Sequence, residues 1–197
     1  PAFKENATAA IHDTQLQKAL GNVETGFVAK RKKGAASLPE FEALRDSARD
    51  LKIHVLKHLD LYLEAYERKV IASGGHVHWA ETAEDARRIV TDICRRLGAK
   101  TVTKGKSMIT EEIALNDHLE AQGIRPVETD LGEYIIQLRG EHPSHIVAPA
   151  VHLTKEQVAG DFRRVHDHLA VDRDLTEPVT LLSEARAVLR EQFLAAD

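Results

Sequence analysis

The sequence is poor in the residues that crosslink chains or anchor them in membranes. Its one cysteine, Cys94, excludes an internal disulfide, which fits a reducing compartment. No apolar run approaches the roughly 18 residues that span a bilayer, and the amino terminus lacks a signal-peptide core. The chain begins Pro-Ala, as chains do after the initiator methionine is removed, so we expect a cytoplasmic protein without a membrane span.

An excess of charge of one sign is also missing. Lysine and arginine number 27 against 31 aspartates and glutamates, a formal net charge of −4, so a broadly basic nucleic-acid surface is not implied. The basic cluster at residues 30–33 could touch nucleic acid or anionic lipid. Four charges in a loop without interleaved aromatic residues are more often simply solvated, so we expect no nucleic-acid partner.

What is present is an ordinary globular composition, with 43% apolar and 29% charged residues and enough length for one good core. The first 73 residues read as helix. Residues 14–27 form one helical pattern, and apolar residues at spacings of three and four indicate a long amphipathic helix from Pro39 to Gly74. We therefore expect a helical amino-terminal extension over residues 1–73.

From residue 74 onward, strand patterns alternate with helix patterns. The expected strands are 76–80, 101–103, 124–129 and 145–148. The expected helices are 82–98, 109–121, 131–138, 154–169 and 180–194. Such alternation is typical of crossover connections, so residues 74–197 are predicted to form a three-layer α/β domain with a parallel sheet.

Residues 105–107 spell the Gly-Lys-Ser that ends a Walker A loop. The motif needs a glycine five residues before Gly105, where this sequence has Lys100, and Gly98 leaves six residues between the glycines. A loop with one glycine cannot wrap its N–H groups around a phosphate, so an ATPase is rejected. The loop still follows a strand and precedes a helix, where lysines and helix N–H groups favour an anion.

Polar loops follow three of the expected strands. In an open parallel sheet ligands bind beyond the carboxyl ends of the strands, so these loops together predict a pocket. Its candidate residues are Lys104, Lys106, Ser107, Glu128, Asp130, Glu133 and His152. The alternative is that Ser107, Thr110 and Asp130 merely cap the helices that follow them.

The eleven histidines raise the question of a metal site. His54 and His58 have the spacing of an HExxH zinc motif, but position 55 is Val rather than the Glu that acts as base. His76 and His78 would share one strand face, again without a third ligand. Neither a metal site nor a catalytic nucleophile is predicted, and Cys94 is expected to be packed rather than reactive.

Three segments, "GGHVHWA" (74–80), "TKGKSMITEEIALN" (103–116) and "ETDLGEYIIQL…HPSHIVAPAVH" (128–152), resemble one family. It is the iron–sulfur-binding subunit family of bacterial L-lactate utilisation (LutB/LldF type). The resemblance runs from about Thr14 to the end of the chain. It implies a LUD domain, similar to the NagB/RpiA/CoA-transferase-like α/β fold. It also implies membership of a cytoplasmic multi-subunit assembly that oxidises L-lactate to pyruvate, in which this subunit relays electrons.

Two departures from that family matter. Its members carry ferredoxin-like cysteine motifs that bind [4Fe–4S] clusters, whereas Cys94 stands alone here, so clusters are expected only in the full-length protein. The family's LUD domain also continues past the position of Asp197. We therefore expect an incomplete LUD domain that leaves a sheet edge and apolar surface uncovered and self-associates to hide them.

The sequence thus supports two hypotheses. In the first, the chain is a non-catalytic scaffold within an electron-transfer subunit that docks partner subunits through residues 38–73 and positions a cluster domain of the same protein. In the second, it is an enzymatic or binding α/β domain whose strand-end pocket holds an anionic metabolite.

Overall fold

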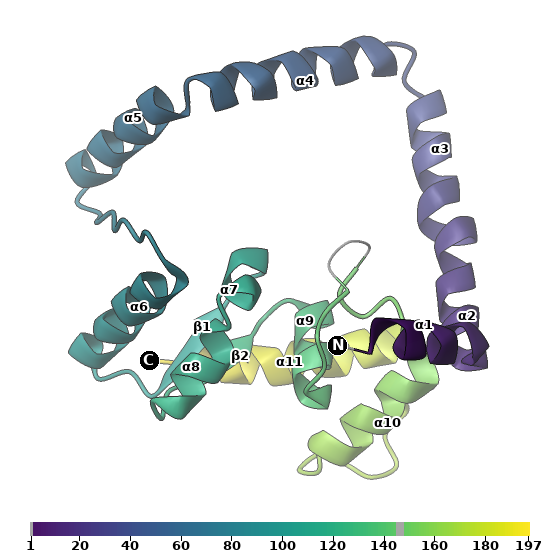
Figure 1. Cartoon of the computed structure of the whole chain (residues 1–197). Helices are drawn as coiled ribbons and strands as arrows, with labels where there is room; N and C mark the ends of the chain where they lie inside the picture. The colour runs from purple at the N-terminus through teal and green to yellow at the C-terminus, as the bar shows by residue number, and fades with distance from the viewer. Residues whose placement is uncertain (1, 145–147) are drawn as a thin grey trace. The chain divides into compact units, whose positions relative to one another are not determined.

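The computed structural model describes residues 2–144 and 148–197, and Figure 1 follows the chain through its helices and strands. The chain divides into two compact units. One contains Pro1–Val23 and Glu81–Asp197, and the other contains Glu24–Ala80. In the described part of the chain, no helix combines the length and apolar character needed to cross a membrane.

The unit of Glu24–Ala80 is helical. Its elements are η1 (a π-helix, Glu24–Val28), α3 (Ala29–Ala36), α4 (Phe41–Lys57) and α5 (Leu59–Ala72). None of these helices contains a buried residue. The segment after α5 is held on that helix, because Trp79 Nε1 donates a 2.9 Å hydrogen bond to Glu67 Oε1. A Cβ atom at Gly75 would lie 2.8 Å from Val70 Cγ1 and 3.2 Å from Val70 O, so a larger residue there would force α5 or the segment to shift.

Three predictions for this region were wrong. Residues 76–80 form no strand, because the segment packs along a helix and no neighbouring strand is there to pair with it. The basic cluster at 30–33 lies inside α3 rather than in a loop. The single long helix is broken at His58, whose backbone (φ −124°, ψ 34°) separates α4 from α5.

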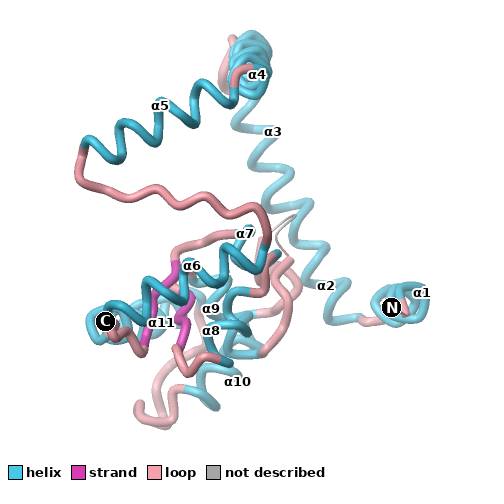
Figure 2. Tube along the Cα trace, turned by 60° about the vertical axis from the view of Figure 1, so that its left-hand side comes forward, coloured by secondary structure: helices cyan, strands magenta, loops and turns pink. Residues whose placement is uncertain are grey.

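The other unit carries the sheet. Its amino-terminal helices are α1 (Phe3–His12) and α2 (Thr14–Val23). After Glu81 the elements are α6 (Ala83–Leu97), β1 (Thr101–Lys104), α7 (Met108–Glu112), α8 (Leu115–Ala121), β2 (Arg125–Glu128), α9 (Leu131–Arg139), α10 (Lys155–Val165) and α11 (Pro178–Ala195). Strands β1 and β2, magenta in Figure 2, are parallel, and the register pairs Thr101 with Arg125 and Lys104 with Glu128.

One hydrophobic cluster joins α6 and α8 to the strands. Its buried members are Cys94, Leu115, Leu119 and Ile124, and Val102 of β1 packs against them. Helix α6 begins where the side chain of Thr82 accepts a hydrogen bond from Asp85 N, and it ends at Gly98 in the left-handed region. Cys94 is packed as expected, and its burial raises the pKa of the thiol.

A second cluster joins α9, α10 and α11. Its buried members are Tyr134, Ile135, Ala159, Phe162, Leu175, Leu181, Ala185 and Val188. A polar chain crosses it, with Tyr134 Oη 2.8 Å from His166 Nε2 and His166 Nδ1 2.7 Å from Glu184 Oε1. Burial alone would raise the pKa of Glu184, but hydrogen bonds from Arg173 and His166 hold it below its ordinary value. Because these buried polar groups find partners on other elements, they fix how the three helices pack.

The parallel strands 101–103 and 124–129 and the helices 82–98, 131–138 and 180–194 are confirmed within a few residues. The predicted helix 109–121 is interrupted at Ala114, whose φ of 50° ends α7 before α8 begins. Helix α10 stops at Val165 instead of residue 169, and α1 was not foreseen. Most of the predicted strand 145–148 lies outside the described residues.

The protein is therefore a mixed α/β chain, mostly helical, with a small parallel sheet of two strands among the described residues. This agrees with an incomplete α/β fold. The finer assignment to a NagB/RpiA-like, three-layer type remains a prediction, as does the division into an extension of residues 1–73 and a domain of 74–197.

Candidate functional site

Two predicted site residues meet directly at the carboxyl ends of the strands. The parallel register sets Lys104 opposite Glu128, and Lys104 Nζ lies 2.6 Å from Glu128 Oε1. Asn116 of α8 completes the group: its Oδ1 accepts from Lys104 Nζ at 2.6 Å, and its Nδ2 donates to Glu128 Oε1 at 2.9 Å. Lys104 is 8% exposed and Glu128 is 2% exposed, so this ion pair is withdrawn from solvent.

Burial decides what Lys104 can do chemically. Removing two charges from water costs several kcal/mol per ion, and only good geometry with further hydrogen bonds offsets that cost. The bonds from Lys104 to Glu128 and Asn116 provide that geometry. The ammonium charge of Lys104 is therefore neutralised inside the protein and does not face a ligand.

Lys106 lies beside two other predicted site residues. Its Nζ is 3.8 Å from Asp130 Oδ1 and 3.7 Å from Glu133 Oε2, distances of electrostatic attraction rather than direct hydrogen bonds. The Lys106 side chain is 48% exposed, whereas that of Glu133 is 3% exposed. Asp130 also caps α9 by accepting a 3.0 Å hydrogen bond from Gly132 N. Lys106 is thus the predicted site cation that water and ligands can reach.

The two carboxyl groups beside Lys106 shift each other's pKa in opposite directions. Burial, a hydrogen bond with Asp130 and repulsion from its charge raise the pKa of Glu133 from 4.5 to about 7. Burial opposes ionisation of Asp130 too, but the hydrogen bond from Glu133 and the attraction of Lys106 hold its pKa below the ordinary value. Near neutral pH, Glu133 can therefore accept or release a proton while Asp130 stays ionised.

The remaining two predicted site residues have other contacts. Ser107 caps α7, where its Oγ accepts from Thr110 N at 3.3 Å, which is the structural alternative considered above. His152 Nε2 lies 2.8 Å from Glu141 Oε2, and the same carboxylate accepts from Arg139 Nε at 2.7 Å. No hydrogen bond or ion pair between described residues joins His152 to either lysine.

A cavity of about 270 Å³ opens beside the buried ion pair. Glu128, Glu133 and Asn116 line it together with further acidic side chains, whereas neither Lys104 nor Lys106 does. Its acidic residues are Glu111, Asp117, Glu120, Glu128, Glu133 and Glu141. Such a lining repels anions, so an anionic ligand would have to bind on the solvent side of Lys106. Among the described residues, no group of three or more His, Cys, Asp or Glu is placed to hold a metal ion.

Sequence reasoning missed two residues that organise this region. Asn116 binds both members of the buried ion pair, and the side-chain amide of Gln137 bonds to β2 at Pro126 O and Glu128 N. Neither position carries a local signal. Asn116 lies twelve residues from both Lys104 and Glu128, so only the packing of α8 against β2 brings them together.

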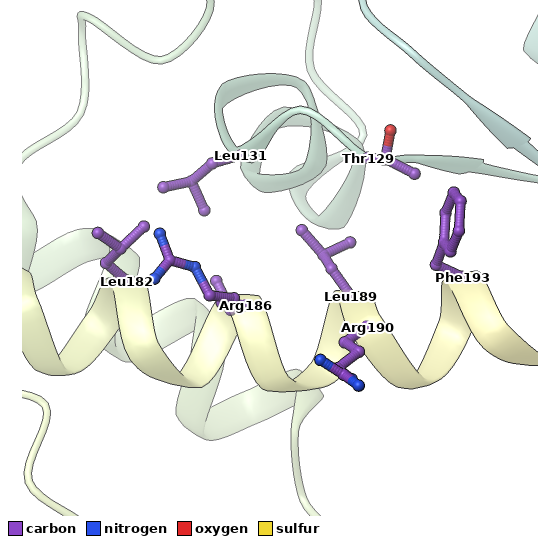
Figure 3. A pocket seen from close by; sticks show the side chains of 8 residues that line it. Thr129, Leu131, Leu182, Arg186, Leu189, Arg190 and Phe193 are labelled. Atoms are coloured by element: carbon purple, nitrogen blue, oxygen red, sulfur yellow. The ribbon is translucent and has the colours of Figure 1, made fainter.

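An apolar groove of about 340 Å³ runs along α11. Figure 3 shows Leu131 facing Leu182, Arg186 and Leu189 of α11 across this groove, with the ring of Phe193 near Thr129. Phe193 is 60% exposed and Leu182 is 40% exposed. A groove of this kind is typical of a contact surface rather than of a reaction site.

Comparison with known proteins decides the family. The model of the LUD domain matches residues 63–197, which include both strands and all of the candidate site. The chain belongs to the LUD-domain family. No solved structure matches this LUD-domain chain.

Several bacterial proteins are similar to this chain. The chain is 41% identical to "Lactate utilization protein B" of Bacillus velezensis over 197 residues and 40% identical to the protein of that name from Bacillus subtilis, again over 197 residues. It is 41% identical over 196 residues to an "Uncharacterized electron transport protein", YkgF, of Escherichia coli. The matches cover 99–100% of this chain but about 40% of the length of each relative.

Proposed function

We propose that this chain is part of an iron–sulfur electron-transfer subunit of a bacterial assembly that oxidises L-lactate to pyruvate. Within that subunit it acts as a scaffold that docks partner subunits. The observation that carries this proposal is the 40–41% identity, across the whole chain, to proteins named for lactate utilisation and electron transport. At that identity over this length, relatives share a fold and a similar role is the simplest expectation.

The chain itself does not fit a [4Fe–4S] cluster. Such a cluster takes four thiolates, and the sequence has one cysteine, Cys94. That thiol is buried in α6 with a raised pKa, which disfavours the thiolate a metal needs. The clusters of the proposed subunit would therefore be held by the further length that the relatives have, and this chain's contribution is structural.

Helices α4 and α5 support a docking role. Neither contains a buried residue, and Leu44, Leu51 and Tyr66 are 52%, 64% and 62% exposed. These residues belong to the apolar face read from the sequence at spacings of three and four. An apolar helix face left in water is costly, so a protein partner that covers it would gain affinity.

The docking role is tested by co-expressing the tagged chain with the other proteins of a lactate-utilisation assembly. Replacing Leu44 and Leu51 by Glu should abolish their co-purification, because both substitutions put charge on the apolar face. The matched control replaces the adjacent exposed residues Arg45 and Lys52 by Glu and should retain the partners. Equal recovery with both double variants would refute docking through this face.

A second candidate is an anion-binding or enzymatic domain that acts on a carboxylate, a phosphate or a CoA-like compound. The half-exposed ammonium of Lys106 and the titratable carboxyl of Glu133 favour it. In that case lactate, inorganic phosphate or CoA should raise the melting temperature of the wild-type chain but not that of Lys106→Ala. If none of the three shifts the wild-type melt, this candidate fails while the docking proposal stands.

A further inference from the structure

The two edges of the small sheet differ in the hydrogen-bond partners of their outward-facing backbone groups. In a parallel ladder, alternate residues of a strand bond to the same neighbour, and the residues between them face the other side. Arg125 N donates to Lys100 O at 2.8 Å and Thr129 N donates to Lys104 O at 3.0 Å. The backbone groups of Thr101 and Thr103 in β1 therefore point away from β2, to the outer edge of β1.

The outer edge of β2 is closed by a side chain. Gln137 Nε2 donates to Pro126 O at 2.9 Å, and Gln137 Oε1 accepts from Glu128 N at 3.0 Å. The primary amide thus takes the place of one residue of a neighbouring strand. Pro126 adds to the closure, because proline has no N–H to offer to another strand.

The outer edge of β1 is instead occupied at its first position by Asp197, through one backbone hydrogen bond and its side-chain carboxylate. Asp197 N donates to Thr101 O at 3.4 Å, and Asp197 Oδ2 accepts from Lys100 N at 2.7 Å and from Thr101 N at 3.0 Å. Ala196, between α11 and Asp197, is already extended, with φ −74° and ψ 149°. Figure 2 shows the carboxyl terminus beside the strands. Helix α11 therefore delivers extended chain to the start of β1.

The direction of such a chain follows from this geometry. Chain that leaves Asp197 at the amino-terminal end of β1 can follow this edge in only one sense, parallel to β1, which is the sense of a β–α–β crossover. The next position on the edge is Thr103, and the first three residues of β1 are the β-branched Thr-Val-Thr that favour strand pairing. Phe193 and Leu194, in the last turn of α11, are 60% and 72% exposed beside the exit point.

We propose that the outer edge of β1 receives a third strand, parallel to β1, in the order β2–β1–third strand. Its occupant is the segment that follows the position of Asp197 in the longer members of the LUD-domain family. Such a segment exists in those relatives, because this chain covers about 40% of their length and matches their N-terminal part. The proposal rests on the family and on the edge geometry, and it does not depend on the proposed function.

Hydrogen exchange followed by NMR tests the proposal. The amides of Val102 and Thr103 are compared in this 197-residue chain and in the chain extended by the segment that follows the matched region in the Bacillus subtilis relative. Val102 N–H faces β2 and should be protected in both proteins. Thr103 N–H should exchange on the order of 100-fold more slowly in the extended protein, because only there does it meet a carbonyl.

Two results would overturn the proposal. One is a protected Val102 amide with an equally fast Thr103 amide in both proteins. The other is protection of Thr103 in the 197-residue chain that grows with concentration and is absent from the extended one, which would make a second copy the occupant. Loss of Val102 protection would show that the extension disturbs folding. In that case the same comparison is made on the full-length relative and on a version of it that ends at the position aligned with Asp197, using the amides aligned with Val102 and Thr103.

Proline substitutions provide an independent check. Thr103→Pro removes an N–H from the outer edge, whereas Val102→Pro removes one that bonds to β2. Val102→Pro should lower the melting temperature of both proteins. Thr103→Pro should leave the 197-residue chain within about 2 °C of wild type and lower that of the extended protein by about 4 °C or more. An equal effect of Thr103→Pro on both proteins would contradict strand addition.

Discussion

Glu133 shows how three neighbours set the chemistry of one side chain. Its carboxyl is buried, interacts electrostatically with the charge of Asp130, and lies 3.7 Å from Lys106 Nζ. Burial and Asp130 favour the protonated form, and Lys106 only partly opposes them. The result is a carboxyl group that titrates near neutral pH.

The first prediction concerns the stability of Glu133→Gln at different pH values. The folded-state pKa of about 7 lies above the ordinary 4.5, so the folded protein binds this proton more tightly than the unfolded chain does. The stabilisation is complete below about pH 4.5 and is lost as the pH rises to about 7. The Gln side chain stays neutral at every pH. The free energy of unfolding of Glu133→Gln should therefore rise relative to that of wild type, by on the order of 1–3 kcal/mol across this range.

Urea unfolding between pH 4.5 and 8 measures this difference. Glu112→Gln, at an exposed position on α7, is the matched control and should run parallel to wild type. A constant difference between Glu133→Gln and wild type at every pH would show that Glu133 does not titrate as described.

The second prediction concerns the buried ion pair. Lys104→Met should cost about 3–5 kcal/mol of unfolding free energy, because Glu128 is left as an uncompensated buried charge. The double variant Lys104→Met with Glu128→Gln should recover much of that loss, since no buried charge remains. Equal losses in the single and double variants, measured by urea unfolding at pH 7, would contradict this account.

At the scale of elements, helix interruptions were the main error of the sequence reading. Residues 109–121 have continuous helical character, yet Ala114 at φ 50° separates α7 from α8. An L-residue other than glycine is strained there, by roughly 1–2 kcal/mol. The break lets Leu115 and Leu119 enter one hydrophobic cluster and turns Asn116 toward Lys104. These contacts stabilise the packed molecule, and the local sequence pattern does not reveal them.

The third prediction follows from that break. Ala114→Gly should raise the unfolding free energy by about 0.5–1 kcal/mol, because glycine adopts a positive φ without a Cβ clash. Ala187→Gly, at an exposed position inside α11, is the control and should lower it by about 1 kcal/mol. Chemical denaturation of both variants separates relief of strain from the general cost of glycine. A loss in Ala114→Gly as large as the control's would show that the strain is not there.

At the scale of the molecule, much apolar surface stays uncovered. A two-stranded sheet is marginal by itself, and here its stability depends on the helices of two hydrophobic clusters. The groove along α11 leaves Leu182 and Phe193 exposed. A surface of this kind favours association with another protein or with a second copy of the chain.

The fourth prediction is therefore self-association of the isolated chain. Light scattering should give a mass above 21.9 kDa that rises with concentration, since association covers the groove. Phe193→Glu should shift the chain toward the monomer by placing a charge in the groove. The control, Glu191→Gln, changes one charge on the same helix and should behave as wild type. A wild-type mass of 21.9 kDa at every concentration would refute the prediction.

Local sequence determined the parts of this protein whose energetics are local. The capping side chains of Thr82, Asp130 and Thr154 and the left-handed Gly98 mark helix ends, because their hydrogen bonds and backbone angles involve residues a few positions away. The motifs of residues 74–152 likewise identified the family without a structure. That Lys104 and Glu128 end neighbouring strands was also readable, since parallel strands end at one edge.

Only the tertiary structure decided what those residues do. The strand register joins Lys104 to Glu128 in a buried ion pair, so the ammonium group that the sequence predicted to bind an anion does not face solvent. Packing of α8 adds Asn116, and packing of α9 sets Gln137 along one edge of the sheet. These outcomes depend on desolvation and on hydrogen bonds between residues far apart in the chain. Both are properties of the packed molecule, whereas spacing along the sequence records only which residues are neighbours.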